Sequence, residues 1–503
     1  MLLLSGSVGA VGAVGVVSAD EPPAPASTAS AGRPWQTVAA DLKSKAITFL
    51  RSQQDATSGG WSVPKPGTPA PHLPAITGLI LSGMLAEQSL GADDPTIKKG
   101  LAYAMGFIKP DGGIYDTILP TYNTAIVLSA LAKVDTPEAR QAIKPAQEFL
   151  KRSQWGTTEP VGVGGAGGKE SPAIVDKSHP NYGGIGYGNR GRPDISNTGF
   201  ALEAWRTSGL PSEDPAYQRA LVFLQRLQML EKTADGKPIN TMPYAKGSRQ
   251  GGFIYATGEN DKTVGQGNSF AGVIDETLST GETKSMLRSY GSVTYLGFKS
   301  YLYAGLRADD PRVVAAVNWA KANWSLDENP GIGTDGYYYY IVMMSRALAA
   351  LGVDTLAVAP LDTFRTTVVV KGLKASTTEA DVRAAVAALD AAAKVSHVEL
   401  DAKAGLAMVI FAEEANAKKL EALLGGTAID GAKVTASMKP PIAAPGTTQS
   451  VAWREALVSK LAKLQRDDGS FATVDDRWME NNQVLTTAYV LIALQEATAS
   501  RGR

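Results

Sequence analysis

The sequence predicts an all-α protein that is made of repeated helical hairpins and is interrupted once by a small α+β domain. Three observations support this prediction. A hairpin unit recurs about six times, helix starts are marked at matching places of the repeat, and the apolar period changes from helix to strand in one segment. Six hairpins are the number that closes a double ring of helices, so we expect an inner and an outer ring.

Each copy of the repeat has an amphipathic segment that ends in an apolar-x-x-x-Gln pattern, a Gly-rich turn with an aromatic residue, and a second apolar segment. The first copy runs through Gln53 to Gly59-Gly60-Trp61, and the last runs through Gln465 to Asp468-Gly469-Ser470-Phe471. The second segment of the last copy, residues 483–497, has its apolar residues at helical spacing. Each copy is therefore predicted to be a pair of helices.

Helix starts are marked by a capping residue that stands directly before a proline. Asp94, Thr136, Asp214 and Asp310 occupy this position. Their side chains accept hydrogen bonds from the first turn, and the proline ring costs no bond there. We interpret these acidic residues as N-caps and not as an Asp-rich metal or diphosphate motif.

The motifs Phe-Leu-x-x-Gln-x-x-x-x-x-Gly-Gly-Trp and Leu-x-x-Gln-x-x-Asp-Gly-Ser-Phe resemble the QW-type repeats of the squalene-hopene cyclase and protein prenyltransferase β-subunit superfamily. The resemblance covers residues 35–360 and 451–497, which are predicted to hold hairpins 1–5 and hairpin 6. It implies an α6/α6 toroid of the terpenoid cyclase type, with an inner ring of helices around a cavity. Proteins with this fold have several different activities, so the resemblance is stronger evidence for the fold than for the function.

Residues 364–438 are predicted to form a ferredoxin-like domain, because strands and helices alternate there as βαββαβ. This segment resembles an RNA-recognition domain, although Val369, Leu406 and Met408 replace the aromatic residues that stack on bases. It equally resembles a heavy-metal-associated domain, whose metal loop would fall near residues 374–378, where no Cys stands. We expect a spacer or protein-contact role, and a Pro-rich linker, residues 439–450, that leads back to the toroid. The expected strands are 366–370, 395–400, 406–411 and 433–437, and the expected helices are 379–389 and 416–424.

Composition excludes several classes of function. Lys+Arg and Asp+Glu both number 49, so a basic surface for nucleic acid is not expected. Cys is absent and His numbers 3, which excludes disulfides, thiolate nucleophiles and Cys-ligated zinc. We therefore predict no metal and no cofactor.

The N-terminal residues 1–19 are uncharged and apolar, and Val17-Ser18-Ala19 places small residues before a cut at Asp20. They predict a secretory signal peptide, although no Lys or Arg precedes the apolar run. An upstream start or an atypical anchor is the alternative. Residues 20–34 have a Pro/Ala/Ser linker composition. We expect an exported protein, periplasmic or secreted, without a membrane span in the mature chain.

The working face of the toroid is predicted from its long connections. Residues 155–193 and 231–291 join outer to inner helices at the same type of junction, so both are expected at one mouth of the cavity. The ferredoxin-like insert is joined at the opposite type of junction and is expected at the other end.

Protonating cyclases of the resembled superfamily use Asp-x-Asp-Asp-Thr at the head of an inner helix, and the middle Asp is the acid. Here Asp194-Ile195-Ser196-Asn197-Thr198 keeps Asp194, while Ser196 and Asn197 replace the acid and its neighbour. Protonation-initiated cyclisation is therefore not expected, and Asp194 is a candidate for either an N-cap or a catalytic residue. The absence of Cys also argues against a zinc prenyltransferase.

A second acidic cluster, Asp475-Asp476-Arg477-Trp478-Met479-Glu480-Asn481, lies in the last turn before an inner helix. Together these residues would supply an acid, an anion site and an aromatic face that stabilises cations. The alternative is a solvated loop in which Asp476 caps or pairs with Arg477. Further candidates for ligand contact, which are alternatively core residues, are Asn197, Tyr187, Tyr290, Tyr295, Lys299, Tyr337 and Tyr340.

Three hypotheses for function follow. The first is an exported toroid that binds an isoprenoid or similar elongated hydrophobic ligand in its cavity, with lyase or isomerase chemistry led by Asp475, Asp476 or Asp194 if it is an enzyme. The second is a non-catalytic scaffold that binds a protein partner through the toroid and the insert. The third is a glycan-active toroid, which needs two carboxylates about 5 to 9 Å apart.

Overall fold

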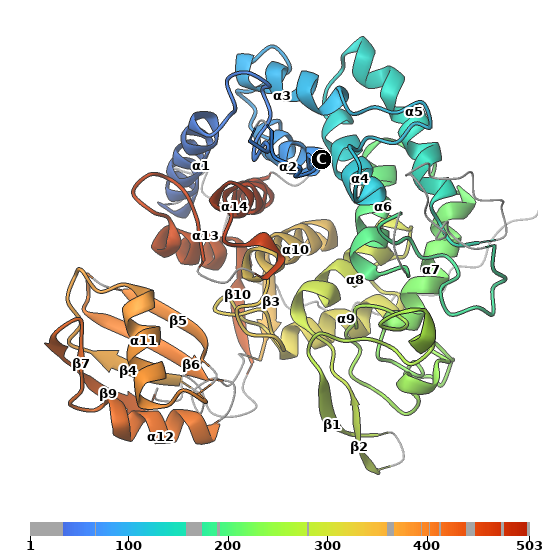
Figure 1. Cartoon of the computed structure of the whole chain (residues 1–503). Coiled ribbons are helices and arrows are strands. Elements are labelled where there is room, and N and C mark those ends of the chain that lie inside the picture. The colour runs from blue at the N-terminus through green and yellow to red at the C-terminus, as the bar shows by residue number, and fades with distance from the viewer. Residues whose placement is uncertain are drawn as a thin grey trace, which may run out of the picture.

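The computed structural model describes residues 34–65, 67–156, 174–188, 192–278, 281–359, 367–393, 395–401, 403–411, 414–438, 448–473 and 477–499. This part of the chain is mostly helical, with fourteen α-helices and small antiparallel sheets (Figure 1). The predicted signal peptide, residues 1–19, lies outside the described residues, as does nearly all of the linker 20–34. No helix in the described ranges is both long and apolar enough to span a membrane.

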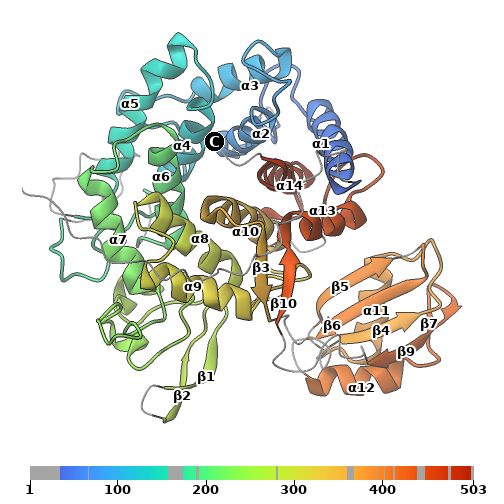
Figure 2. The same cartoon turned by 180° about the vertical axis from the view of Figure 1, so that it is seen from behind.

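Six helices form the inner layer of the main body, and each contacts the next until the last returns to the first (Figures 1 and 2). Most residues of these helices are buried, because each helix packs on two inner neighbours and all but α10 also make extensive contacts with outer helices. In chain order they are α2 (Pro74–Met84), α4 (Pro120–Leu131), α6 (Ile195–Thr207), α8 (Gly291–Tyr303), α10 (Tyr337–Leu351) and α14 (Gln483–Thr498).

Six further helices lie outside this ring and bury one face each. Helix α1 contacts both α13 and α14, so the first helix of the chain packs against the last hairpin. This contact joins the two ends of the described chain. The outer helices are α1 (Pro34–Ser52), α3 (Pro95–Met105), α5 (Pro137–Arg152), α7 (Pro215–Leu227), α9 (Pro311–Ala322) and α13 (Trp453–Leu464).

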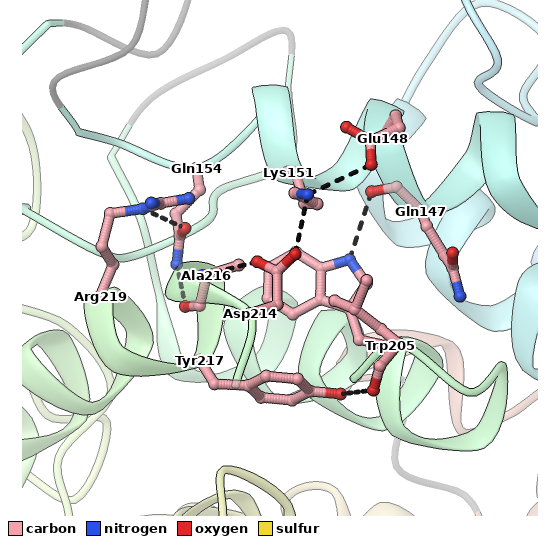
Figure 3. A network of polar contacts seen from close by, with 10 residues as sticks. Gln147, Glu148, Lys151, Gln154, Trp205, Asp214, Ala216, Tyr217 and Arg219 are labelled. Carbon is pink, nitrogen blue, oxygen red and sulfur yellow. Dashed lines mark hydrogen bonds and ion pairs between the residues drawn. The ribbon is translucent and has the colours of Figure 1, made fainter. Parts of the chain in front are cut away.

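The predicted N-caps are confirmed. Asp94, Asp214 and Asp310 accept hydrogen bonds from backbone N–H groups in the first turns of α3, α7 and α9, and Thr136 does so in α5. Asp214 also pairs with Lys151 of α5, with 2.9 Å between Nζ and Oδ2 (Figure 3). Asp94 and Asp214 therefore also join neighbouring outer helices, whereas Asp310 pairs with Arg312 of its own helix, and none of the three belongs to a cluster of metal ligands in the described ranges.

The glutamines of the repeat link one outer helix to another. Gln154 at the end of α5 donates from Nε2 to the Ala216 carbonyl of α7 at 3.0 Å and to the Gly183 carbonyl at 2.8 Å. Arg219 donates in turn to Oε1 of Gln154 at 2.7 Å (Figure 3). The same paired carbonyl contacts are made by Gln54 with Gly59 and Thr96, by Gln228 with Gly251 and Arg312, and by Gln465 with Leu42 and Gly469.

In the first repeat the residue that links the helices is Gln54, and not Gln53, which fits the repeat pattern of the sequence. The side chain of the exposed Gln53 donates to Ser52 next to it. We expect Gln54→Ala to lower the free energy of unfolding by about 1 to 2 kcal/mol, because two carbonyls lose their donor. Gln53→Ala should leave it unchanged. Urea unfolding of both variants measures the difference, and equal effects would contradict the assigned role.

A second repeated contact joins five of the six Gly-rich turns to an inner helix. The hydroxyl of a threonine near the start of the helix accepts a hydrogen bond from the residue that follows the turn glycines. These threonines were not singled out by sequence, although they recur four or five residues into the helix. The pairs are Thr77 with Trp61, Thr124 with Ile114, Thr198 with Ile185, Thr294 with Phe253 and Thr487 with Phe471.

Between α10 and α13 the elements follow the order strand, helix, strand, strand, helix, strand. The four-stranded antiparallel sheet has the order β5-β6-β4-β9, and its two helices contact each other. Its buried apolar residues form a cluster separate from that of the helical rings. The elements are β4 (Thr367–Lys371), α11 (Glu379–Leu389), β5 (Val395–Asp401), β6 (Leu406–Phe411), α12 (Glu414–Leu424) and β9 (Thr435–Met438), with a short hairpin of β7 (Ala428–Ile429) and β8 (Ala432–Lys433).

The chain enters and leaves this segment through two paired strands. Strand β3 (Thr355–Val358) pairs antiparallel with β10 (Gln449–Ala452). The end of the expected linker 439–450 is therefore part of a strand, because residues 449 and 450 belong to β10. Residues 439–447 lie outside the described ranges. The long connection 231–291 carries another hairpin, β1 (Val273–Thr277) with β2 (Thr283–Leu287).

Candidate functional site

A cavity of about 210 Å³ lies at the N-terminal ends of the six inner helices. Every inner helix supplies lining residues from its first two turns, so the six helices begin at the same end of the ring. The long connections 155–193 and 231–291 both reach this cavity, through Tyr187 in the first and Tyr255, Phe270 and Tyr290 in the second. The helix residues of the lining are Ala75, Ile76, Tyr122, Ser196, Phe200, Ser292, Val293, Tyr339, Leu485 and Tyr489.

The wall of the cavity is mainly aromatic. Tyr255 and Phe270 have ring centroids 4.6 Å apart, and Phe270 lies 5.5 Å from Trp478. On the helical side Tyr122 packs edge-on against Phe200 at 5.4 Å. These ring faces give the cavity an apolar, polarisable surface.

Hydroxyl groups interrupt this surface at a few points. Ser196 Oγ and Tyr339 OH are 3.1 Å apart, and Tyr187 OH lies 3.5 Å from Tyr255 OH. Burial raises the pKa of the Tyr187, Tyr255 and Tyr339 phenols above the ordinary value. The phenols are therefore neutral at physiological pH and act as hydrogen-bonding groups.

Glu480 is the one carboxylate among the described lining residues. The sequence placed it in the second acidic cluster, but Asp475 and Asp476 were selected there as the candidate acids. Its side chain accepts hydrogen bonds from Tyr339 N at 2.7 Å and from Tyr338 N at 3.2 Å. The residue is 1% exposed. Glu480 therefore caps the start of α10 from another part of the chain.

Asp194 is the N-cap of α6, which is one of the two roles that the sequence left open. Its oxygens accept from Asn197 N at 2.9 Å and from Asn197 Nδ2 at 2.8 Å. It is fully buried, and burial raises its pKa above the ordinary value. Neither Asp194 nor Asn197 lines the cavity, although the charge of Asp194 reaches the hydroxyls of Tyr187, Tyr255 and Tyr290.

Arg477 and Trp478 form part of the rim. The Arg477 guanidinium lies 5.3 Å from the Phe270 ring centre and 4.5 Å from the Trp478 ring centre, and it pairs with Asp335. Trp478 and Met479 are 41% and 44% exposed while they also line the cavity. They separate the interior from solvent. The two acids that precede them, Asp475 and Asp476, lie outside the described residues.

Besides Asn197 and Arg477, four further residues predicted for ligand contact do not line the cavity. Tyr295 and Tyr340 pack against each other at 5.7 Å in the core, and Tyr337 OH donates to the Leu326 carbonyl. Lys299 is buried in an ion cluster. The reason is helix rotation: in the run 337–340 only Tyr339 lines the cavity, because successive residues differ by about 100° around a helix.

Four aromatic lining residues of the inner helices, Tyr122, Phe200, Tyr339 and Tyr489, were not predicted from the sequence. Their position could have identified them from the sequence, because each lies within the first two turns of an inner helix. Phe270 and Tyr255 carry no such signal, because they lie in an irregular connection.

The ion cluster of Lys299 lies in the C-terminal halves of the inner helices, away from the cavity. Glu203 of α6 pairs with Lys299 of α8 at 2.5 Å and with Arg346 of α10 at 2.8 Å, and Glu496 of α14 lies 4.0 Å from Arg346. Lys299 is fully buried, and Glu203 and Arg346 nearly so. The described residues of this end are therefore held by buried charge pairs. Nowhere in the described ranges do three His, Cys, Asp or Glu side chains gather as metal ligands would.

No protein-family model and no curated protein match the chain. Among solved structures it is similar to the type II terpene cyclase MstE from Scytonema, with 14% identity, 92% of this chain and 98% of that chain covered, and a TM-score of 0.32. A family 76 glycoside hydrolase from a bovine Bacteroides thetaiotaomicron strain is 9% identical, with 62% and 64% covered and a TM-score of 0.39. A protein from Actinoplanes is 15% identical, with 92% and 100% covered and a TM-score of 0.31. These likenesses are too distant to assign a function.

Proposed function

We propose that this chain is an α6/α6 toroid of the terpenoid cyclase type and that it binds an isoprenoid or similar elongated hydrophobic ligand in the cavity. One observation carries the proposal: nine of the nineteen residues that line the cavity are aromatic, and one is a carboxylate. Ring faces contact an unsaturated hydrocarbon chain without leaving polar groups unpaired.

If the protein is an enzyme, lyase or isomerase chemistry is the class that this lining suits, because aromatic faces stabilise carbocations. Asp475 and Asp476 are the preferred acids, since they directly precede the rim residues Arg477 and Trp478. Asp194 is less suited, because Asn197 occupies its two oxygens. Within this proposal the segment 364–438 is a ferredoxin-like domain for protein contact, and the chain is exported.

A glycan-active site would need two carboxylates across the cavity. The described lining offers Glu480 alone, and its oxygens are held by two backbone N–H groups. A hydrocarbon ligand is therefore the better match.

Binding is tested by native mass spectrometry and calorimetry with farnesol and geranylgeraniol. The variant Ser196→Leu places a larger apolar group in the cavity wall, and we expect it to weaken binding about tenfold or more, which is at least about 1.4 kcal/mol. Ser285→Leu on the exposed strand β2 is the matched control and should bind like the wild type. A binding-defective variant must keep its melting temperature, which shows that the fold is intact.

Binding of a mannan oligosaccharide in place of both prenols would contradict the proposal and favour the glycan hypothesis. Chemistry is tested separately, by gas chromatography of prenol and prenyl substrates after incubation. We expect Asp475→Asn/Asp476→Asn to abolish any isomerised or cyclised product while binding is retained. Product formation that survives this change would exclude the two acids.

A further inference from the structure

The rim of the cavity carries two guanidinium groups that are built into its aromatic wall. Arg192 lies 5.2 Å from the ring centre of Tyr255, and Arg477 lies 5.3 Å from that of Phe270. Since Tyr255 and Phe270 are themselves 4.6 Å apart, the four side chains form one stack, with a cation at each end. Both rings line the cavity, and neither arginine is itself a lining residue. Arg192 is partly exposed and Arg477 is exposed, so both guanidinium groups lie beside the aromatic wall at the protein surface.

The two cations differ in their described partners. Arg477 pairs with Asp335. Arg192 donates from Nε to the Glu259 carbonyl at 3.0 Å, and no described carboxylate lies within ion-pair distance of it. Stacking on a ring fixes the plane of a guanidinium and leaves its edge N–H groups available for an anion.

The surroundings carry charge of both signs, and the buried carboxyl groups at this end, Glu480 and Asp194, are held by backbone N–H groups at helix starts. The inner helices begin at the cavity, and their N-termini carry partial positive charge. Helices α2, α4 and α8 start without a side-chain cap of their own. Arg477 and Arg192 also act on one hydroxyl: both oppose the rise that burial causes in the pKa of Tyr290, which lines the cavity at the end of the second connection.

We propose that the ligand is an anionic amphiphile whose apolar chain occupies the aromatic cavity and whose carboxylate or phosphate group is bound at the rim by Arg192 and Arg477. The inference rests on the proposed function, since it assigns the head group of the same ligand. The Asp335 carboxylate competes with the ligand for Arg477. The anionic group of the ligand therefore either displaces Asp335 or binds Arg477 beside it.

The test compares three probes with one hydrocarbon chain and different heads: neutral farnesol, farnesoic acid and farnesyl phosphate. We expect one or both acids to bind the wild type about tenfold or more tighter than farnesol, with an affinity that falls as salt rises. Arg192→Gln and Arg477→Gln should each weaken binding of that acid about tenfold and change farnesol binding less than about twofold. A preference for one acid identifies the head group as carboxylate or phosphate.

Two further variants sharpen the result. Asp335→Asn removes the competing carboxylate, so it should tighten binding of the acids and leave farnesol binding unchanged. Arg307→Gln, at an exposed arginine between α8 and α9, is the matched control and should change nothing. Thermal unfolding of each variant shows whether the fold is kept.

Equal affinity of the wild type for all three probes, unchanged by either arginine variant, would overturn the head-group assignment while leaving the cavity as a hydrocarbon site. Failure of all three probes to bind would overturn both proposals.

Discussion

Gly183→Ala is expected to destabilise the protein by more than about 4 kcal/mol, a loss that few single substitutions cause. Gly183 has φ +86°, and an added Cβ would lie 1.8 Å from the Arg219 carbonyl oxygen of α7. The left-handed backbone alone costs about 1 to 2 kcal/mol for alanine. The rest follows from displacement of α7, since a backbone atom cannot rotate away. Urea unfolding and the yield of soluble protein measure the effect.

The matched control is Gly209→Ala. Gly209 has nearly the same backbone, φ +80°, but no atom lies within 4 Å of the added Cβ. Gly209→Ala should lower the free energy of unfolding by about 1 to 2 kcal/mol, which is the penalty for an alanine in the left-handed conformation. If both substitutions cost the same, close packing of the Gly-rich turn on the next outer helix would not be a determinant of stability.

Glu203→Gln is expected to lower the free energy of unfolding by about 3 to 5 kcal/mol. The substitution keeps the shape of the side chain but leaves Lys299 and Arg346 with Glu496 as their remaining carboxylate in the cluster. Chemical denaturation at pH 7 measures the loss. Asp309→Asn, which breaks an ion pair in which both side chains are exposed, is the control and should leave the unfolding midpoint unchanged.

The double variant Glu203→Gln/Lys299→Met separates charge from packing. Because it removes one cation together with the carboxylate, we expect it to be less destabilised than the sum of its single variants. Additive losses would mean that the two side chains contribute independently and that no buried pair is stabilising.

The same cluster predicts acid sensitivity. Burial by itself raises the pKa of Glu203, but the charges of Arg346 and Lys299 outweigh burial and lower it to about 2, from 4.5 for the free residue. A carboxyl group with a lowered pKa in the folded state stabilises it above the unfolded value. This contribution is lost as the pH falls from 4.5 to about 2. Glu203→Gln should therefore show a smaller fall in stability across this window than the wild type, and an equal fall would contradict the assignment.

Several features of the protein were determined by sequence alone, and all of them depend on neighbours within a few residues. Asp or Thr before Pro predicted the starts of four outer helices, and the apolar spacing predicted the inner ones. The βαββαβ order between α10 and α13 could likewise be predicted, because apolar residues recur at different spacings in strands and in helices. The absence of Cys excluded thiolate and disulfide chemistry without any structure.

The tertiary structure decided which of these residues face the cavity. Tyr339 lines it while its neighbours Tyr337 and Tyr340 do not, since the rotation of α10 is set by packing against α8 and α14. Gln54 and not Gln53 reaches the next helix for the same reason. Tyr255 and Arg192 meet at the rim from connections far apart in the chain, and local propensity carries no information about such a contact. The sequence thus determined the elements, whereas non-local packing determined the site.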